Sequence, residues 1–369
     1  MFKIRLAAAL SMLFLMLAGT AFAAPSQQQY MQDMDKGLDL VMGKMQGQPR
    51  QPLIFSSNLF FAHGAAIPAI PEDVLIKYAD ALHDAGAGRV DINLAIDPWV
   101  KGQKDIVDKY DAVIARIRRH GMQLAINPEF NRGKDRSYDF AAWSADALKA
   151  YPEIAARYHP DIFVVIHEPT TMAARMGQKL SPRAWADFAQ KAIAAVKQAS
   201  PRTRCGVGLL PEEWMYTRPF LDLPGLDTLS VDIYSLKGLK ALNGMIAAAK
   251  KAGKGVYVEE TWRTPYVPAR QPNLEAWSSV GIGNAAYEDL DAKWLATIAA
   301  YAGVWGMEAV TPFWSTTFFL YVKDGRDGAL DAGYNGRVIE AIRKGERTKT
   351  FEAFRRMAQE AGGQGSGGR

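Results

Sequence analysis

The stretch Phe163-Val164-Val165-Ile166-His167-Glu168-Pro169 decides the fold prediction. Its apolar residues occupy both parities, which is typical of a strand buried on both faces of a parallel sheet. Pro169 has no N–H to donate to a neighbouring strand, so the strand should end with Glu168 at its carboxyl end. One such glutamate can simply begin a loop. However, Gly255-Val256-Tyr257-Val258-Glu259-Glu260-Thr261-Trp262 repeats the pattern, which favours a functional edge of a parallel sheet.

Strand-like and helical segments alternate eight times between residues 53 and 358. We expect strands at residues 53–61, 90–96, 122–126, 163–168, 205–210, 229–234, 256–258 and 309–314. We expect helices at 71–85, 105–120, 140–158, 181–199, 236–252, 287–302 and 336–358, with a short helix or turn at 215–221. These units predict an α/β protein with a single (β/α)8 TIM barrel. A doubly wound open sheet is less well supported, because Ser56-Ser57-Asn58 stands where such folds carry a Gly-rich phosphate loop.

The first 23 residues have the pattern of a secretory signal peptide. Lys3 and Arg5 precede an apolar core at residues 6–18, and Ala21-Phe22-Ala23 predicts cleavage near Ala23/Ala24. We therefore expect a periplasmic or secreted protein with no membrane anchor after cleavage. The rest of the chain divides into a polar lead-in at 24–52, the catalytic barrel at 53–358 and a flexible Gly-rich tail at 359–369.

Composition excludes several classes of function. Cys205 is the only cysteine, so no internal disulfide can form, and its apolar neighbours predict a small core side chain. The net charge of +5 is scattered rather than gathered into a basic stripe, which argues against nucleic acid as a partner. The five histidines, His63, His83, His120, His159 and His167, show no metal-binding pair, and Gly-x-Ser-x-Gly is absent. We expect a monomer that needs no metal or cofactor.

Carboxylates and tryptophans follow the predicted strands, at the rim where a barrel keeps its functional groups. They include Asp97, Trp99, Asn127, Glu129, His167, Glu168, Glu212, Glu213, Trp214, Asp232, Tyr234, Glu259, Glu260, Trp262 and Trp314. Aromatic faces stack on sugar rings, and paired carboxylates hydrolyse glycosidic bonds. Each tryptophan taken alone is better explained as core or rim packing. Together these residues indicate a carbohydrate site, with Trp99, Trp214, Trp262 and Trp314 as candidate sugar platforms.

Glycoside hydrolysis requires two carboxyl groups about 5 Å apart for retention of configuration, or about 6.5–9.5 Å apart for inversion. Strands four and seven lie opposite one another across a barrel mouth, so Glu168 and Glu260 can face each other over a sugar. The competing interpretation is a non-catalytic polysaccharide-binding barrel derived from a glycosidase, in which the aromatic residues matter and the carboxylates do not.

The pattern resembles the clan of retaining (β/α)8 glycoside hydrolases that includes cellulases, β-mannanases, β-galactosidases and arabinogalactanases. Glu168-Pro169 is similar to the end of the clan's Asn-Glu-Pro motif, and Glu260-Thr261-Trp262 resembles its Glu-Thr-Gly-Trp motif without the glycine. The resemblance implies cleavage of a β-linked poly- or oligosaccharide, with Glu168 as acid/base and Glu260 as nucleophile. It also implies that Tyr234 bonds the nucleophile, that Trp314 floors a sugar subsite, and that Asn127 and His167 orient the sugar and the carboxylates.

Two positions depart from the clan's pattern. His167 stands where the clan has asparagine before the acid/base, and Val90-Asp91-Ile92 stands where Val-Arg-Ile is expected. His167 can contact substrate or can be a neutral, hydrogen-bonded imidazole, and both interpretations stay open. The departures indicate an outlying member of the clan, or a barrel that has kept binding and lost catalysis.

The choice of nucleophile between Glu259 and Glu260 rests on strand geometry. Successive strand residues point to opposite sides, so at most one of the two should face the barrel axis unless the strand end is bulged. Glu260 shares parity with Val256 and Val258, which we expect to fill the barrel interior, whereas Tyr257 would face the helices. We therefore favour Glu260 and keep Glu259 as the alternative.

Overall fold

The computed structural model describes residues 26–62, 66–129, 138–264, 282–322 and 332–365, so the predicted signal segment lies outside it. Its core is a closed barrel of parallel strands in sequence order. The strands are β1 (Ile54–Asn58), β2 (Arg89–Ala95), β3 (Gln123–Glu129), β4 (Ile162–His167), β5 (Arg204–Leu209), β6 (Leu226–Ile233), β7 (Gly255–Thr261) and β8 (Ala309–Pro312). β1 pairs with β8 as well as with β2, which closes the sheet and confirms the predicted single (β/α)8 barrel.

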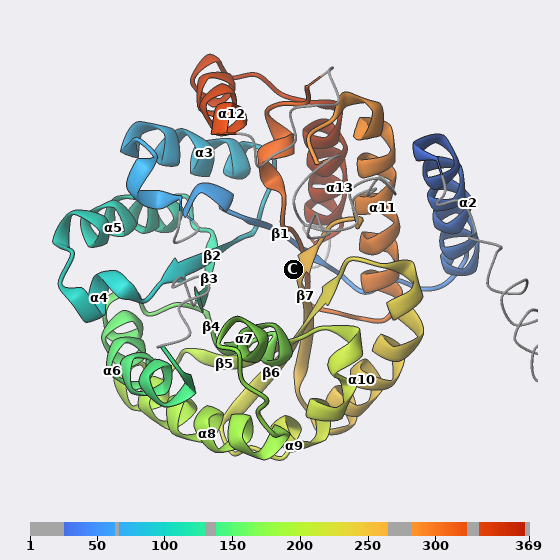
Figure 1. Cartoon of the computed structure of the whole chain (residues 1–369). Helices are drawn as coiled ribbons and strands as arrows, with labels where there is room; N and C mark the ends of the chain where they lie inside the picture. The colour runs from blue at the N-terminus through green and yellow to red at the C-terminus, as the bar shows by residue number, and fades with distance from the viewer. Residues whose placement is uncertain (1–25, 63–65, 130–137, 265–281, 323–331, 366–369) are drawn as a thin grey trace, which may run out of the picture.

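Helices surround the strands as an outer ring (Figure 1). The α-helices are α2 (Gln27–Met45), α3 (Glu72–Asp84), α4 (Asp97–Lys101), α5 (Lys104–Arg119), α6 (Phe140–Tyr158), α7 (Pro169–Arg175), α8 (Pro182–Ala199), α9 (Thr217–Leu221), α10 (Leu239–Lys251), α11 (Glu288–Val304), α12 (Ala332–Lys344) and α13 (Lys349–Gly365). Short 3-10 turns are η1 (Phe60–Ala62), η2 (Ile67–Ala69), η3 (Pro211–Tyr216), η4 (Leu236–Gly238), η5 (Ala285–Tyr287) and η6 (Ser315–Phe318). Among the described helices, none is long and apolar enough to cross a membrane.

Local sequence explains where the helices start. The Ser181 side chain accepts a hydrogen bond from the Ala184 N–H, and Pro182 occupies the first turn of α8, where its missing N–H costs nothing. The Asp139 side chain caps α6 in the same way by accepting from the Ala142 N–H. The start of each of these two helices is therefore fixed by the capping residue that precedes it.

The two chain ends are more helical than the sequence analysis predicts. The polar lead-in forms α2, which spans 19 residues and packs on α11. At the other end, α13 continues to Gly365, which corrects the prediction of a flexible tail beginning at residue 359. The remaining part of that predicted tail, residues 366–369, lies outside the described residues.

β4 and β7 each carry a register shift shortly before the carboxylate of interest. In β4, Val164 pairs with Gly206 but Ile166 pairs with Val207, so Val165 is an extra residue. In β7, Val258 pairs with Val231 but Glu260 pairs with Asp232, so Glu259 is an extra residue. A bulge re-aims the side chains that follow it. Both candidate catalytic strands therefore turn their last residues toward the barrel mouth.

The interior parity of β7 is opposite to the one predicted. Tyr257 packs inside the barrel with Ala125, Ile162, Val164 and Ala309, while Val256 and Val258 join the core beneath the helices. The guanidinium of Arg89 stacks over the Tyr257 ring at 4.3 Å and so gives a tyrosine a partner inside the barrel. Glu259 consequently points inward with Tyr257, and the bulge lets Glu260 point inward as well.

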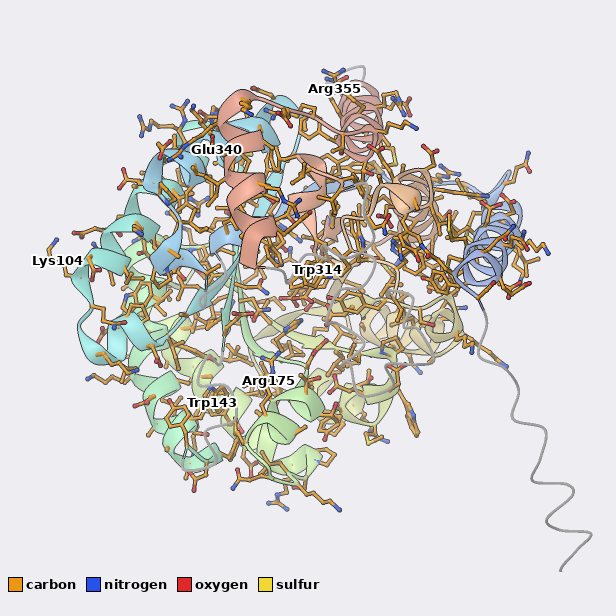
Figure 2. The ribbon with its side chains drawn as sticks, turned by 45° about the horizontal axis from the view of Figure 1, so that its top comes forward. Lys104, Trp143, Arg175, Trp314, Glu340 and Arg355 are labelled. Atoms are coloured by element: carbon orange, nitrogen blue, oxygen red, sulfur yellow. The ribbon has the colours of Figure 1, made fainter. Side chains whose placement is uncertain are left out.

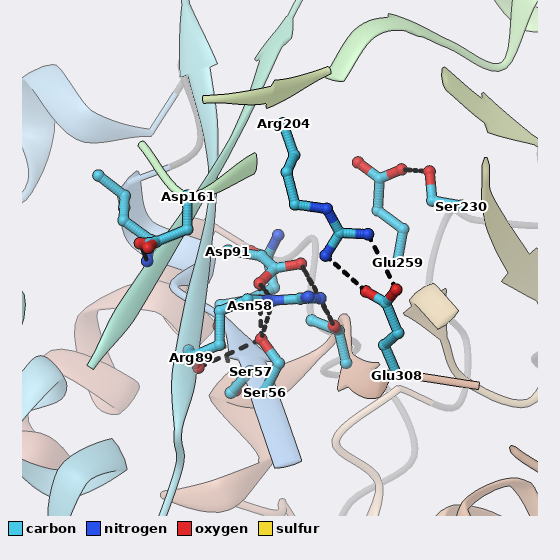
Figure 3. Close-up of polar contacts among 12 residues, drawn as sticks. Ser56, Ser57, Asn58, Arg89, Asp91, Asp161, Arg204, Ser230, Glu259 and Glu308 are labelled. Atoms are coloured by element: carbon cyan, nitrogen blue, oxygen red, sulfur yellow. Dashed lines mark hydrogen bonds and ion pairs between the residues drawn. The ribbon is translucent and has the colours of Figure 1, made fainter. Parts of the chain in front are cut away.

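The barrel base is closed by two ion pairs, of which Arg89–Asp91 is buried and Arg204–Glu308 is partly exposed. Arg89 donates to both carboxylate oxygens of Asp91 at 2.8 and 3.1 Å, and Ser56 donates to the same carboxylate at 2.6 Å. Arg204 forms a two-pronged pair with Glu308, with both N···O distances at 2.8 Å, as Figure 3 shows. These pairs fill the end of the barrel opposite the strand ends that carry Glu168 and Glu260.

Candidate active site

The side chains of Glu168 and Glu260 meet at the carboxyl ends of β4 and β7. One carboxylate oxygen of each lies within a group of four atoms that are all within 4.8 Å of one another. Glu168 adopts the left-handed conformation (φ 46°), immediately after β4 and before Pro169 opens α7. Non-glycine residues rarely adopt this backbone, and such residues concentrate at functional sites. The two predicted catalytic carboxylates are thus brought together.

Glu260 is held by donors from two other strands. Tyr234, directly after β6, donates its hydroxyl to Oε2, and Asn93 on β2 donates Nδ2 to Oε1 at 3.2 Å. Burial and the negative charge of Glu260 hold the pKa of Tyr234 well above its usual value of 10, so the phenol stays a donor. The Glu260 side chain is therefore fixed through both oxygens.

His167 sits among three carboxylates. Its Nε2 lies 2.9 Å from Asp232 Oδ2, 3.7 Å from Glu260 Oε1 and 4.0 Å from Glu259 Oε2. Burial alone lowers the pKa of His167, but the charges of Asp232, Glu259 and Glu260 outweigh it and raise the pKa well above 6.5. The surrounding carboxylates therefore favour the protonated imidazole over the neutral form.

Glu168 is suited to carry a proton. Burial raises its pKa above 4.5, the His167 cation opposes that effect, and the Glu260 charge adds to it. Behind it, the buried Glu213 accepts hydrogen bonds from the N–H groups of Thr170 (2.6 Å) and Leu210 (2.9 Å). These bonds tie the start of α7, which follows Glu168, to the end of β5.

Glu259 lies deeper in the barrel than Glu168 and Glu260. It accepts a hydrogen bond from Ser230 on β6, as Figure 3 shows, and burial raises its pKa to about 7 despite His167 and Ser230. Glu260, in contrast, reaches Tyr234 and Asn93 at the mouth. The two adjacent glutamates therefore lie at different depths, with Glu260 nearer the mouth.

Asn127 and Asn93 line the β2–β3 side of the mouth. They pair in register, and Asn93 Nδ2 also lies 3.3 Å from Glu129 Oε1. The Asn127 amide is buried, and neither of its polar atoms has a hydrogen-bond partner among the residues that the structure describes. A buried amide in this state has capacity for a polar ligand group.

The predicted tryptophan platforms occupy four different environments. Trp314 lies at the end of β8, packed against Phe60 (4.9 Å between ring centroids) and Phe313 (5.4 Å). It lies toward the middle of the molecule in Figure 2, as does Arg175 of α7, whereas Lys104 and Arg355 lie at the edge. Phe313 in turn packs edge-on against Tyr234 at 6.4 Å. Trp314 is therefore beside the mouth.

The structure does not bring the other three tryptophans into this group. Trp99 packs against Tyr110 and Tyr158, on helices α5 and α6. Trp214 is 63% exposed and borders a groove between α9 and α10 on the outer wall. Trp262 is 1% exposed, so its ring faces are covered by protein.

Two contributors to the site, Asn93 and Gly208, were absent from the predicted set, and Asp232 was predicted at the rim without a role of its own. Asn93 bonds Glu260, Asp232 pairs with His167, and Gly208 leaves room for both His167 and Glu259. A signal for Asn93 was present, because Arg89, Asp91 and Asn93 alternate with apolar residues in a strand that is buried throughout. A Cβ on Gly208 would lie 2.5 Å from His167 Cδ2 and 2.6 Å from Glu259 Oε2.

The same mouth has the donor set for a cation. His167, Glu168, Asp232 and Glu260 each offer one nitrogen or oxygen atom within the 4.8 Å group. A metal ion would require a neutral His167, whereas the surrounding carboxylates favour its protonated form.

Comparison with solved structures gives the fold a context. The clostridial cellulose synthase subunit Z from Clostridioides difficile is 12% identical with a TM-score of 0.52, covering 79% of this chain and 99% of that one. An exo-β-1,4-mannosidase from Opitutaceae bacterium strain TAV5 is 11% identical (TM-score 0.57; 85% and 60% covered). An FMN-binding β-glucuronidase from Faecalibacterium prausnitzii L2-6 is 12% identical (TM-score 0.51; 84% and 44% covered).

No protein-family model matches the sequence, and a search of curated proteins finds no match either. At identities of 11 to 12%, the structural likenesses show the fold alone. Together with the closed eight-stranded parallel barrel, they show that this chain has a (β/α)8 fold, which it shares with these structures.

Proposed function

We propose that this chain is an exported glycoside hydrolase that cleaves a β-linked poly- or oligosaccharide with retention of configuration. The observation that carries the proposal is the separation of Glu168 and Glu260. One carboxylate oxygen of each lies within 4.8 Å of the other, at the carboxyl ends of β4 and β7. Retaining enzymes place their two carboxyl groups about 5 Å apart, and inverting enzymes need about 6.5–9.5 Å to admit a water molecule. The separation in this chain supports retention.

In the proposed mechanism, Glu168 donates a proton to the leaving glycosidic oxygen while Glu260 attacks the anomeric carbon. The C–O bond breaks, and a covalent glycosyl–enzyme ester forms on Glu260. Glu168, now a carboxylate, removes a proton from water, which attacks the same carbon and releases Glu260. The raised pKa of Glu168 suits the first step, and the loss of the Glu260 charge in the ester favours the ionised Glu168 of the second.

Neighbouring residues support these roles. Tyr234 and Asn93 orient Glu260, and the His167 cation stabilises negative charge at the mouth. The unpartnered amide of Asn127 is placed to bond a sugar hydroxyl, and Trp314 offers an aromatic wall beside Tyr234 and Phe313. The names of two structural neighbours, a β-mannosidase and a β-glucuronidase, support the choice of β-linked substrates.

The test is a hydrolysis screen of the mature protein against aryl β-glycosides, β-glucans, mannans and galactans. The wild type and Glu212→Gln, which alters an exposed glutamate after β5, should both be active. Glu260→Gln should lose activity by at least about 10³-fold, since the covalent step requires a carboxylate. If the wild type binds a polysaccharide but neither it nor any variant hydrolyses one, the chain is instead a non-catalytic polysaccharide-binding barrel.

Dialysis against EDTA separates this proposal from metal-assisted hydrolysis at the same residues. Activity should be unchanged, because the proposed two-carboxylate mechanism uses no metal ion. A loss that Zn²⁺ or Mn²⁺ restores would contradict the two-carboxylate mechanism.

A further inference from the structure

Helix α2, built from the polar lead-in, is attached to the barrel at two places close to the strand ends. Lys293 of α11 pairs with Asp35 at 2.5 Å and with Asp39 at 2.7 Å. Gly37 lies so close to η4 that a Cβ there would be 2.9 Å from Leu236 Cδ1. η4 follows Tyr234 after one residue, so α2 touches the segment that leaves β6. Figure 1 shows α2 outside α11, on the β7 side of the molecule.

A chain of hydrogen bonds leads from α2 to the proposed nucleophile. Tyr30 of α2 donates its hydroxyl to the carbonyl oxygen of Thr264, three residues beyond β7. Thr264 in turn donates both its N–H (2.9 Å) and its hydroxyl (2.6 Å) to the carbonyl oxygen of Tyr234. Tyr234 then donates its own hydroxyl to Glu260 Oε2. Burial raises the pKa of Tyr30, so its hydroxyl keeps the proton that it donates.

The start of this chain is fixed by buried groups. Arg263, next to Thr264, pairs with Asp291 of α11 at 2.5 Å, and both side chains are inaccessible to solvent. The Arg263 guanidinium also stacks over the Tyr287 ring at 4.0 Å, and the Tyr30 ring packs edge-on against Tyr287 at 6.3 Å. The Tyr30 hydroxyl therefore bonds a segment whose neighbouring Arg263 is held by buried contacts, so the position of Tyr30 affects that of Thr264.

We propose that Tyr30 is a positioning residue for catalysis: through Thr264 and Tyr234, the amino-terminal helix fixes the carboxylate of Glu260. This inference rests on the proposed function for its kinetic consequence, but its structural claim can be measured without catalysis. On this proposal, α2 contributes to catalysis although it precedes the barrel in the sequence.

The kinetic test uses Tyr30→Phe and Thr264→Val in the full mature chain. Each removes one hydroxyl and keeps the shape of the side chain. Each should lower kcat about three- to tenfold with KM changed less than about twofold, as expected when one hydrogen bond to a positioned group is lost. The double variant should lose less than the product of the two single effects, because both bonds belong to one chain.

Lys293→Met is the matched control. It removes both ion pairs between α2 and α11 and leaves the hydrogen-bond chain intact, so kcat should stay within about twofold of wild type. If Tyr30→Phe lowers the melting temperature but leaves kcat unchanged, Tyr30 is structural only and the proposal is wrong. Equal kcat losses in Tyr30→Phe and Lys293→Met would likewise assign the effect to helix attachment.

An NMR measurement keeps the outcome separate from that of the proposed function. The ring signals of His167, whose Nε2 lies 3.7 Å from Glu260, can be assigned among five histidines by their absence in His167→Asn. Tyr30→Phe should shift these signals, and Lys293→Met should not. Unchanged His167 signals in Tyr30→Phe would overturn the positioning role even if no glycoside is hydrolysed by the wild type.

Discussion

Glu168 combines a left-handed backbone with a partly buried carboxyl group, and both features belong to this one residue. As the proposed acid/base it is needed most when the leaving group is poor. Glu168→Gln should lower kcat/KM by about 10²–10⁴ on alkyl or oligosaccharide glycosides, which matches the usual contribution of general acid catalysis. On activated aryl glycosides, bond cleavage needs no proton, so the loss should be much smaller. Equal losses on both substrate types, measured by initial rates, would argue against the assignment.

The raised pKa of Glu168 also sets the sign of the pH dependence. The protonated form is the active acid, so kcat/KM should fall as pH rises through a value above 4.5, the ordinary pKa of glutamic acid. Burial is the first cause, and the Glu260 charge adds to it. A pH–rate profile on an oligosaccharide should therefore show a basic limb that disappears in Glu168→Gln. A limb that persists in this variant would indicate another acid.

At the residue scale, the sequence predicted that Glu168 and Glu260 would meet, but not the three carboxylates that surround His167. Glu168, Glu260 and Tyr234 follow from strand ends and from the resemblance to known motifs. The charge of His167 does not, because it depends on Asp232, Glu259 and Glu260 meeting around one nitrogen. Such long-range juxtaposition has no local signal in the chain.

At the scale of single elements, β5 makes room for the site through Gly208. Gly208→Ala should place a methyl group against His167 and Glu259, which are confined by their charged partners. We expect a loss of about 1–3 kcal/mol in the free energy of unfolding and a lower kcat. Gly244→Ala is the control: it lies in α10 with nothing within 4 Å of the added Cβ, and should stabilise by about 0.5–1 kcal/mol. Denaturant titration and initial rates measure both, and a neutral Gly208→Ala would contradict the packing described.

Strand positions were predictable, but strand irregularities were not. The alternation of strand-like and helical segments in the sequence predicted the positions of all eight strands to within a few residues. The bulges at Val165 and Glu259 leave no mark in the sequence, because the residues around them are apolar or acidic on both parities. The inward Tyr257 was missed for the same reason, since its partner Arg89 comes from a distant strand. The tryptophans show the limit of rim assignments, because the loops that follow the strands decide whether a ring faces the mouth.

At the scale of the whole molecule, the repeated strand–helix unit was sufficient to predict a closed barrel, but not the role of α2. Because this segment is mostly polar, the sequence did not reveal that it forms a helix that packs on α11. The signal peptide predicted before α2 stays a prediction. Amino-terminal sequencing of protein recovered from the periplasm or medium should begin within a residue or two of Ala24, because Ala21-Phe22-Ala23 is a typical cleavage signal. Recovery of intact Met1 from those fractions would contradict export by cleavage.

The central claim is that Glu260 is the nucleophile of a retaining mechanism and that Glu168 is its partner. Chemical rescue tests it most directly. Glu260→Gly removes the carboxylate and leaves space for a small anion, so azide can attack the anomeric carbon in its place. We predict that this variant is inactive alone and that with azide it converts an activated β-glycoside into a glycosyl azide of inverted configuration, identified by NMR. Rescue in Glu259→Gly instead, or in neither variant, would contradict the account.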